Sequence, residues 1–148
     1  MNLKSYNNIG IASIAIYAVL SHSSELTLSK ALLILPLFSS SPLTQHLSRS
    51  STKVKSVEKL IAEKTSLFSN FNGRFYDTLA LSINSIQFLA KANLVTLENG
   101  IIRNNSEEVY YTSQMGKRAG KIFSASENLS RLLNAPTEKL YLNLRIEL

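Results

Sequence analysis

Hydrophobic residues gather in nearly continuous runs at the start of the chain and fall into helical spacing further on. The first run, Ile9–Leu20, is apolar all round and predicts a helix that is covered on every side within a bundle. The second run, Ala31–Phe38, belongs to a helix that Thr27 or Ser29 caps, and its Pro36 is expected to kink or end that helix. Both runs therefore predict buried core.

Neither apolar run has the ~20 residues that a membrane-spanning helix needs. Ile9–Leu20, which follows Lys4, also resembles the apolar part of a signal peptide, but Ser21–Ser24 lacks the usual cleavage pattern. We therefore expect a cytoplasmic chain with no membrane segment. Ser41 then predicts the cap of a short helix from Leu43 to about Arg49, with Pro42 in its first turn.

The middle of the chain begins with a polar, basic linker, Arg49–Lys55. Apolar residues at helical spacing then predict one helix over Val57–Phe71, with Lys59 and Glu63 paired on its outer side and Asn72-Gly73 ending it. The linker is expected to be exposed, either simply solvated or in contact with phosphate.

Between residues 75 and 103 the pattern changes from helical to strand-like. A short helix is expected over Phe75–Leu81, and Ser82 is expected to cap a second one over Ile83–Ala92. Asn99-Gly100 lies between two β-rich segments and predicts a tight hairpin turn, because both residues tolerate positive φ. The order helix, helix, hairpin is that of a winged helix-turn-helix.

The C-terminal part predicts further helices. A long helix is expected over Ser113–Leu133, and Ala135–Thr137 breaks the chain. Val109–Thr112 fits either a strand or the approach to that helix, and Leu140–Leu148 fits a helix or, by its alternation, a strand.

The predicted fold class is mainly α (α+β): an N-terminal helical bundle, a winged-helix-like helix-helix-hairpin and C-terminal helices. The 148 residues are expected to form a single compact unit with parts at 1–72, 73–112 and 113–148.

Composition excludes some classes of function but does not identify a single one. The chain has no cysteine, which excludes disulfides, thiol catalysis and cysteine-ligated zinc. Sixteen Lys and Arg against ten Asp and Glu give a net charge of +6, which suits nucleic acid, an acidic partner or an anionic surface.

Catalytic groups are sparse. His22 and His46 are the only histidines, and neither has an acidic residue close in sequence to orient it. Metal-ligand spacings and glycine-rich phosphate loops are missing from the sequence. We therefore expect no enzyme activity, no cofactor and no metal site.

Two groups of residues are candidates for contact with DNA or a partner. Asn84, Gln87 and Lys91 share the outward side of the predicted second helix and have the side chains that read base edges or contact phosphate, although an ordinary solvated face has the same composition. The second group is basic and suits phosphate or an acidic partner. It comprises Arg49, Lys53 and Lys55 of the linker and Lys117, Arg118 and Lys121 of the long helix.

The order of these segments resembles the middle component of bacterial three-component ABC systems, among them the Lamassu-type antiphage defences. The resemblance covers roughly residues 7–133. Its first signature lies in LTLSKALLILPLFSSSPLTQHL, and its second in LSINSIQFLAKANLVTLENGII. The residues that carry it are Lys30, Leu33, Leu35, Pro36 and Leu37 in the first, and Ser82, Ile86, Phe88, Leu89, Leu94, Leu97 and Gly100 in the second.

This resemblance implies a non-catalytic adaptor between an SMC-like ABC ATPase and an effector subunit, often a nuclease, in a complex that senses foreign DNA. It also implies that partner subunits cover the apolar sides of the first two helices. The alternative is a free winged-helix transcription regulator that uses Asn84, Gln87 and Lys91. The sequence leaves open the effector, the stoichiometry, the trigger and whether the chain touches DNA directly.

Overall fold

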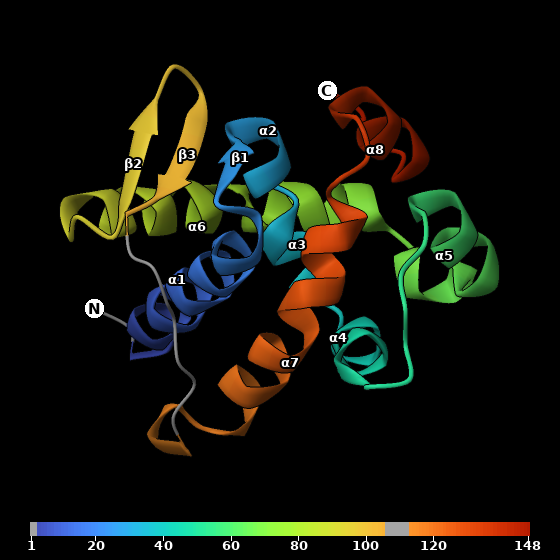
Figure 1. Cartoon of the computed structure of the whole chain (residues 1–148), viewed down its shortest axis with the longest axis horizontal. Coiled ribbons are helices and arrows are strands. Elements are labelled where there is room, and N and C mark those ends of the chain that lie inside the picture. Colours follow the sequence, from blue (N-terminus) through green and yellow to red (C-terminus); the bar gives the residue numbers. More distant parts are fainter. Residues whose placement is uncertain (1–2, 106–112) are drawn as a thin grey trace.

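The computed structural model describes residues 3–105 and 113–148, and it confirms the mainly α (α+β) class (Figure 1). The helices are α1 (Leu3–Ser23), α2 (Leu28–Ala31), α3 (Ile34–Phe38), α4 (Ser41–Ser48), α5 (Val57–Glu63), α6 (Phe71–Lys91), α7 (Lys117–Leu132) and α8 (Thr137–Asn143). The 3₁₀ turns are η1 (Thr65–Phe68) and η2 (Ser113–Met115). The strands are β1 (Glu25–Thr27), β2 (Val95–Glu98) and β3 (Ile101–Asn104).

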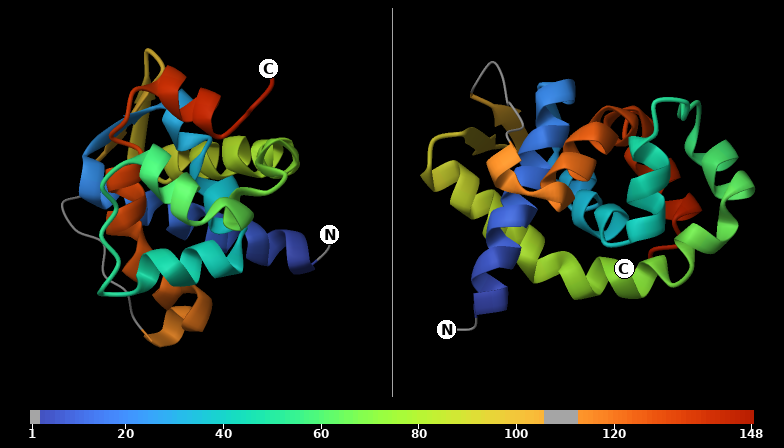
Figure 2. Two further views of the ribbon diagram at one scale, coloured as in Figure 1. Left: turned by 90° about the vertical axis from the view of Figure 1, so that its right-hand side faces the viewer. Right: turned by 90° about the horizontal axis from the view of Figure 1, so that it is seen from below.

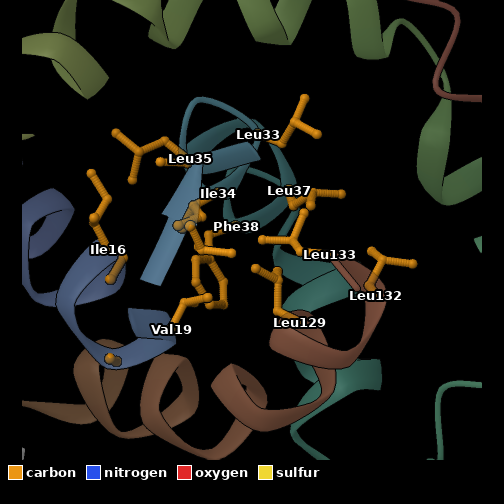
Figure 3. Close-up of a cluster of buried hydrophobic side chains, with 14 of the residues drawn as sticks. Ile16, Val19, Leu33, Ile34, Leu35, Leu37, Phe38, Leu129, Leu132 and Leu133 are labelled. Carbon is orange, nitrogen blue, oxygen red and sulfur yellow. The ribbon is translucent and has the colours of Figure 1, made fainter. Parts of the chain in front are cut away.

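Helix α1 is the central element, as its apolar sequence predicts. It packs against α3, α6 and α7, and Ile16, Val19 and Leu20 are completely buried (Figures 1 and 3). The expectation that partner subunits cover this helix is wrong, because the chain's own helices bury it. Within the described residues, no helix combines the length and the hydrophobicity that crossing a bilayer requires.

One cluster of buried side chains connects the whole fold, with members from Ala12 in α1 to Leu144 after α8. Figure 3 shows its centre, where side chains of α1, of the α3 region and of the end of α7 meet. The labelled residues there are Ile16, Val19, Leu33, Ile34, Leu35, Leu37, Phe38, Leu129, Leu132 and Leu133. The division into parts at 1–72, 73–112 and 113–148 stays a prediction.

Residues 28–38 form two short helices rather than one. Thr27 caps α2 as predicted, since its hydroxyl accepts a hydrogen bond from the backbone N–H of Lys30 at 3.3 Å. The break falls at Leu32 and Leu33, one turn before Pro36. Proline has no N–H to donate to the residue four positions earlier, and its ring clashes with that carbonyl, so the helix cannot continue through Leu32.

Helix α4 begins one residue earlier than the predicted cap allows. Ser40, not Ser41, is the N-cap, and its side chain accepts from the backbone N–H of Leu43 at 3.2 Å. Pro42 lies in the first turn as predicted, where its missing N–H costs nothing.

The single helix predicted over Val57–Phe71 is wrong. Helix α5 ends at Lys64, whose backbone leaves the helical region (φ −131°, ψ 45°), and η1 follows. Asn70 then adopts a left-handed conformation (φ 52°) and turns the chain into α6. The apolar spacing persists through these turns because η1 also packs on the core, so periodicity alone does not reveal them.

The pair of helices predicted over Phe75–Leu81 and Ile83–Ala92 is also wrong, because α6 is one continuous helix of 21 residues. Ser82 is buried in its middle and caps nothing. Gly73, predicted to end a helix, lies in the first turn of α6, where a Cβ atom would come within 2.7 Å of the Asn70 side chain. The predicted helix-helix-hairpin of a winged helix is therefore not formed by residues 75–103.

The hairpin itself is confirmed. Asn99 (φ 53°) and Gly100 (φ 73°) form its turn, and β2 pairs antiparallel with β3, with Leu97 opposite Ile102. The structure adds a third strand that sequence reasoning missed: β1 pairs antiparallel with the free edge of β3, so the sheet order is β1-β3-β2. Leu26 of β1 lies opposite Ile102, and both side chains are buried.

The C-terminal helices are shorter than predicted. Ser113–Met115 is a 3₁₀ turn, and Gly116 (φ 93°) separates it from α7. Helix α8 covers Thr137–Asn143, so the helix predicted over Leu140–Leu148 is confirmed as far as Asn143, and it ends before Arg145 (φ 59°). Val109–Thr112 lies outside the described residues.

Candidate functional site

The basic linker between α4 and α5 has a defined path. After the C-terminal end of α4, the backbone N–H of Thr52 donates to Arg49 O at 3.1 Å, and the Thr52 hydroxyl donates to His46 O at 2.7 Å. Arg49, Lys53 and Lys55 are exposed along this path. The predicted exposure of these three cations is therefore correct, but the segment is a shaped turn rather than a featureless loop.

Asn128 of α7 fixes this path from the core side. Its side-chain amide donates to Leu47 O at 2.9 Å and to Thr52 O at 3.0 Å, and its side-chain oxygen accepts from Val54 N at 3.4 Å. Asn128 is 8% exposed, so these bonds satisfy polar groups that water hardly reaches. Sequence reasoning missed this residue; its only signal is an amide among the inward-facing positions of α7.

A cavity of about 310 Å³, here called the linker cradle, lies between the end of α4, the linker and α5. Its charged lining residues are Arg49, Lys53, Lys55, Lys59 and Glu63. Lys59 and Glu63 are 4.0 Å apart and both well exposed, so this ion pair contributes little to stability. Four cations therefore face one carboxylate across the cradle.

His46 lines the cradle, and its pKa lies below the ordinary value for histidine. Partial burial of the ring lowers its pKa, and the positive charges of Lys64 and Arg49 lower it further, while Glu63 opposes them weakly. Desolvation is the larger cause of this lower pKa and the surrounding cations are the smaller one. A bound anion would act in the opposite direction.

The second basic group lies at the start of α7. Ala119, Ile122 and Ala125 turn inward to the core, and this orientation places Lys117, Arg118 and Lys121 on the outside. No acidic residue occupies the first turn of α7. The two cations of that turn therefore add to the positive end of the helix dipole instead of offsetting it.

These three cations line a groove of about 260 Å³, here called the α7 groove, together with residues of α4 and its approach. The other lining residues are Phe38, Ser41, Thr44, Gln45 and Ile122. Helix α4 packs along α7 (Figure 2), with the α7 groove beside its first turns and the linker cradle at its C-terminal end. We call α4, the cradle and the α7 groove together the basic surface.

Both basic groups, which are far apart in the sequence, therefore lie next to the short helix α4, one beside its first turns and the other at its C-terminal end. The structure does not add the third predicted group to them. Asn84, Gln87 and Lys91 are exposed on α6, and this end of α6 lies beside the hairpin, at the opposite end of the molecule from α5 and the linker (Figure 1). Two apolar side chains share the exposed side of α6 with them: Ile83, 42% exposed, and Phe88, 53% exposed.

In the two described stretches of chain, no three His, Cys, Asp or Glu side chains come together as ligands would. The chemistry that the basic surface offers is the attraction of anions by guanidinium and ammonium groups and hydrogen bonding by hydroxyls.

Comparison with known proteins gives one match. The family model described as ABC-three component (ABC-3C) system Middle Component 3 matches residues 11–148. No match was found among curated proteins or among solved structures.

Proposed function

The chain belongs to the Middle Component 3 family of ABC-three component systems, and from this premise we propose that it is a non-catalytic adaptor. It bridges an SMC-like ABC ATPase and an effector subunit of the nuclease type. The assembly is a bacterial defence complex of the Lamassu kind that acts against phage and plasmids and senses DNA.

The family match is the observation that carries this proposal, because it includes every described element from the middle of α1 to the C-terminus. A middle component of a multi-subunit system has partner subunits. A bridging subunit needs two docking surfaces that do not overlap.

The exposed apolar side chains supply two such surfaces. Phe88 and Ile83 lie on α6 near the hairpin, whereas Leu142, 79% exposed, lies on α8. The hairpin and α8 stand apart on the same long side of the molecule (Figure 1). Large apolar side chains at this exposure favour contact with another protein. We therefore assign one partner to α6 and the other to α8, in place of the buried α1.

Co-purification of the chain with the ABC ATPase and the effector of its system tests the assignment. We expect Phe88→Glu to lose one of the two partners and Leu142→Glu to lose the other, because each change places a charge in an apolar contact. Ser124→Glu is the matched control, because Ser124 is exposed on α7 and belongs to neither surface. A wild-type chain that stays a monomer and ignores the ATPase would contradict the adaptor role.

A specific observation favours a second candidate, the free winged-helix regulator. Asn84, Gln87 and Lys91 do share an exposed side of α6, and α6 leads directly into the β2–β3 hairpin. A mobility-shift assay with the chain's own promoter separates the two functions. Loss of a sequence-specific shift in Asn84→Ala and Gln87→Ala would favour the regulator, whereas an adaptor is indifferent to both changes.

A further inference from the structure

The basic surface concentrates charge in a way that the fold itself does not require. Four cations and one carboxylate line the cradle, and three cations and no carboxylate line the α7 groove. Within the described residues, Arg49, Lys53, Lys55, Lys117, Arg118 and Lys121 form no ion pair. Positive charges that line the same cavity repel one another, so an anion bound there is attracted by several of them at once.

Hydroxyl groups lie among these cations. Ser51 and Ser56 line the cradle, and Ser41 lines the α7 groove. The Ser56 oxygen accepts from the backbone N–H of Lys59 at 3.1 Å, which leaves its own hydrogen free to donate. Serine hydroxyls mixed with Lys and Arg are the groups that proteins direct at phosphate oxygens when they hold a nucleic-acid backbone without reading its bases.

The two cavities adjoin different parts of α4, so a ligand that fills both is longer than a single small anion. Helix α4 has eight residues, which at 1.5 Å each gives a length of about 12 Å between its two ends. One strand of a DNA duplex carries a phosphate every ~3.4 Å along the axis, so about three or four phosphates cover that length. A single run of backbone can therefore reach both cavities.

The cradle is also formed in advance. Asn128 holds the linker backbone through three hydrogen bonds, so the chain loses little conformational freedom when a ligand enters. A flexible basic tail would have to be ordered at that moment.

From these observations we propose that the linker cradle and the α7 groove form one binding site for the sugar-phosphate backbone of nucleic acid, with α4 lying along the strand between them. This inference deepens the proposed function, on which the choice of DNA as the physiological ligand rests. The site reads charge and spacing, not sequence.

Fluorescence anisotropy of the full chain with a labelled 20-base-pair duplex of arbitrary sequence tests the site. We expect the logarithm of affinity to fall linearly with the logarithm of salt, by about 0.9 per phosphate contacted. Lys53→Glu/Lys55→Glu and Lys117→Glu/Arg118→Glu should each weaken binding by more than about tenfold, and Lys53→Ala should lower the salt slope by about 1. An unrelated duplex should bind equally well.

Lys91→Glu is the matched control, because it reverses one exposed cation on α6, away from the basic surface, and should change affinity less than about twofold. A larger loss in Lys91→Glu than in the cradle and groove variants would overturn the proposal in favour of base reading by α6. So would loss of binding from only one of the two double variants, because a single site needs both cavities. If a Glu variant does not fold, the same positions are changed to Gln, which removes the positive charge without reversing it.

His46 provides a local readout. Binding of the duplex should raise the His46 pKa, followed by NMR of the imidazole protons, because phosphate offsets the charges of Arg49 and Lys64. The chain has only two histidines, so the His22 ring at the end of α1 is an internal reference. Binding without any response at His46 would overturn the placement of phosphate in the cradle.

Poly-glutamate and inorganic phosphate serve as competing probes. We expect neither to displace the duplex at equal charge concentration, because neither reproduces the spacing of backbone phosphates. Displacement by poly-glutamate at similar concentration would overturn the proposal and identify the surface as a dock for an acidic protein segment.

The cradle and groove variants should still co-purify with the ATPase and the effector. If the duplex-binding results contradict this site, the adaptor proposal still stands. If the wild-type chain does not co-purify with the ATPase and the effector, the proposal of a nucleic-acid site still stands.

Discussion

Helices α1 and α6 are both 21 residues long and pack against each other, yet they meet different surroundings (Figure 2). Most side chains of α1 from Ala12 to Leu20 are buried. Helix α6 buries one side, including Ile86 and Leu89, and leaves the other open.

The difference shows that the apolar content of a helix and the exposure of its apolar side chains are separate properties. The helix with the most continuous apolar sequence is covered over most of Ala12–Leu20 by other helices of the same chain. The amphipathic α6, which looks self-sufficient by its pattern, carries Ile83 and Phe88 on its exposed side. Exposed apolar side chains are therefore found at the exceptions to a helical pattern and not where the pattern is most hydrophobic.

The largest expected effect contrasts the two helices directly. Ile16→Ala should lower the free energy of unfolding by about 2–5 kcal/mol, because Ile16 is completely buried and the change leaves a cavity. Phe88→Ala should lower it by less than about 1 kcal/mol, because the ring is 53% exposed. Urea denaturation of both variants measures the difference. Equal losses would show that the free chain covers α6 as well, and the comparison would fail.

The next effect concerns α7, which covers α1 on one side and holds the linker on the other. Asn128→Ala should cost about 2–3 kcal/mol, because it leaves Leu47 O and Thr52 O without their donor. Urea denaturation measures this loss, and limited proteolysis should show faster cleavage between residues 49 and 56. Asn84→Ala on the open side of α6 is the control, with a change within about 0.5 kcal/mol. An intact, protease-resistant linker in Asn128→Ala would contradict the anchoring role.

A smaller effect of opposite sign is expected inside α6. The Ser85 hydroxyl is completely buried and has no hydrogen-bond partner among the described residues. Ser85→Ala should therefore raise the free energy of unfolding by about 1 kcal/mol, because it removes a buried polar group. Thermal or urea denaturation against the exposed control Ser124→Ala measures it. A loss of stability would show that a buried water satisfies the hydroxyl.

The smallest effect is the pH dependence contributed by His46. Its folded pKa lies below the ordinary histidine value, so the unfolded chain takes up this proton first as the pH falls. The free energy of unfolding should thus decrease as the pH drops below about 6.5 and level off below the folded pKa. His46→Gln should flatten that part of the stability profile, and His22→Gln is the matched control. An increase in stability on acidification in the same range would contradict the sign.

Local signals in the sequence predicted those elements whose cause is local. The turn at Asn99-Gly100, the Thr27 cap and the buried α1 all follow from residue types within a few positions of one another. The exposure of Lys117, Arg118 and Lys121 follows equally from the helical spacing of their neighbours.

The errors arise where backbone conformation departs from side-chain pattern. Lys64 falls at a position of the predicted helix over Val57–Phe71 where the spacing calls for an apolar residue, and helix α5 ends just before it. Ser82 has the side chain of a cap but lies in mid-helix, since the apolar face of α6 continues past it. At Ser82 the burial of its neighbours on α6 overrode the local preference for a cap, whereas residues 62–66 around Lys64 are exposed and no core contact there holds the helix together.

The sequence did not predict contacts between segments that are far apart along the chain. Strand β1 is three residues long and exists because it pairs with β3, and the linker owes its shape to Asn128, 74 residues beyond Val54. The basic surface was predictable as two groups of cations, but their meeting on α4 depends on the packing of α4 against α7.

Strand β1 also connects the hairpin to the end of α1. Three paired residues, the Arg103–Glu25 ion pair at 2.9 Å and the bond from Leu28 N to Gly100 O at 2.7 Å tie β3 to the chain directly after α1. Because β1 directly follows α1, the hairpin cannot shift relative to α1 without breaking these contacts.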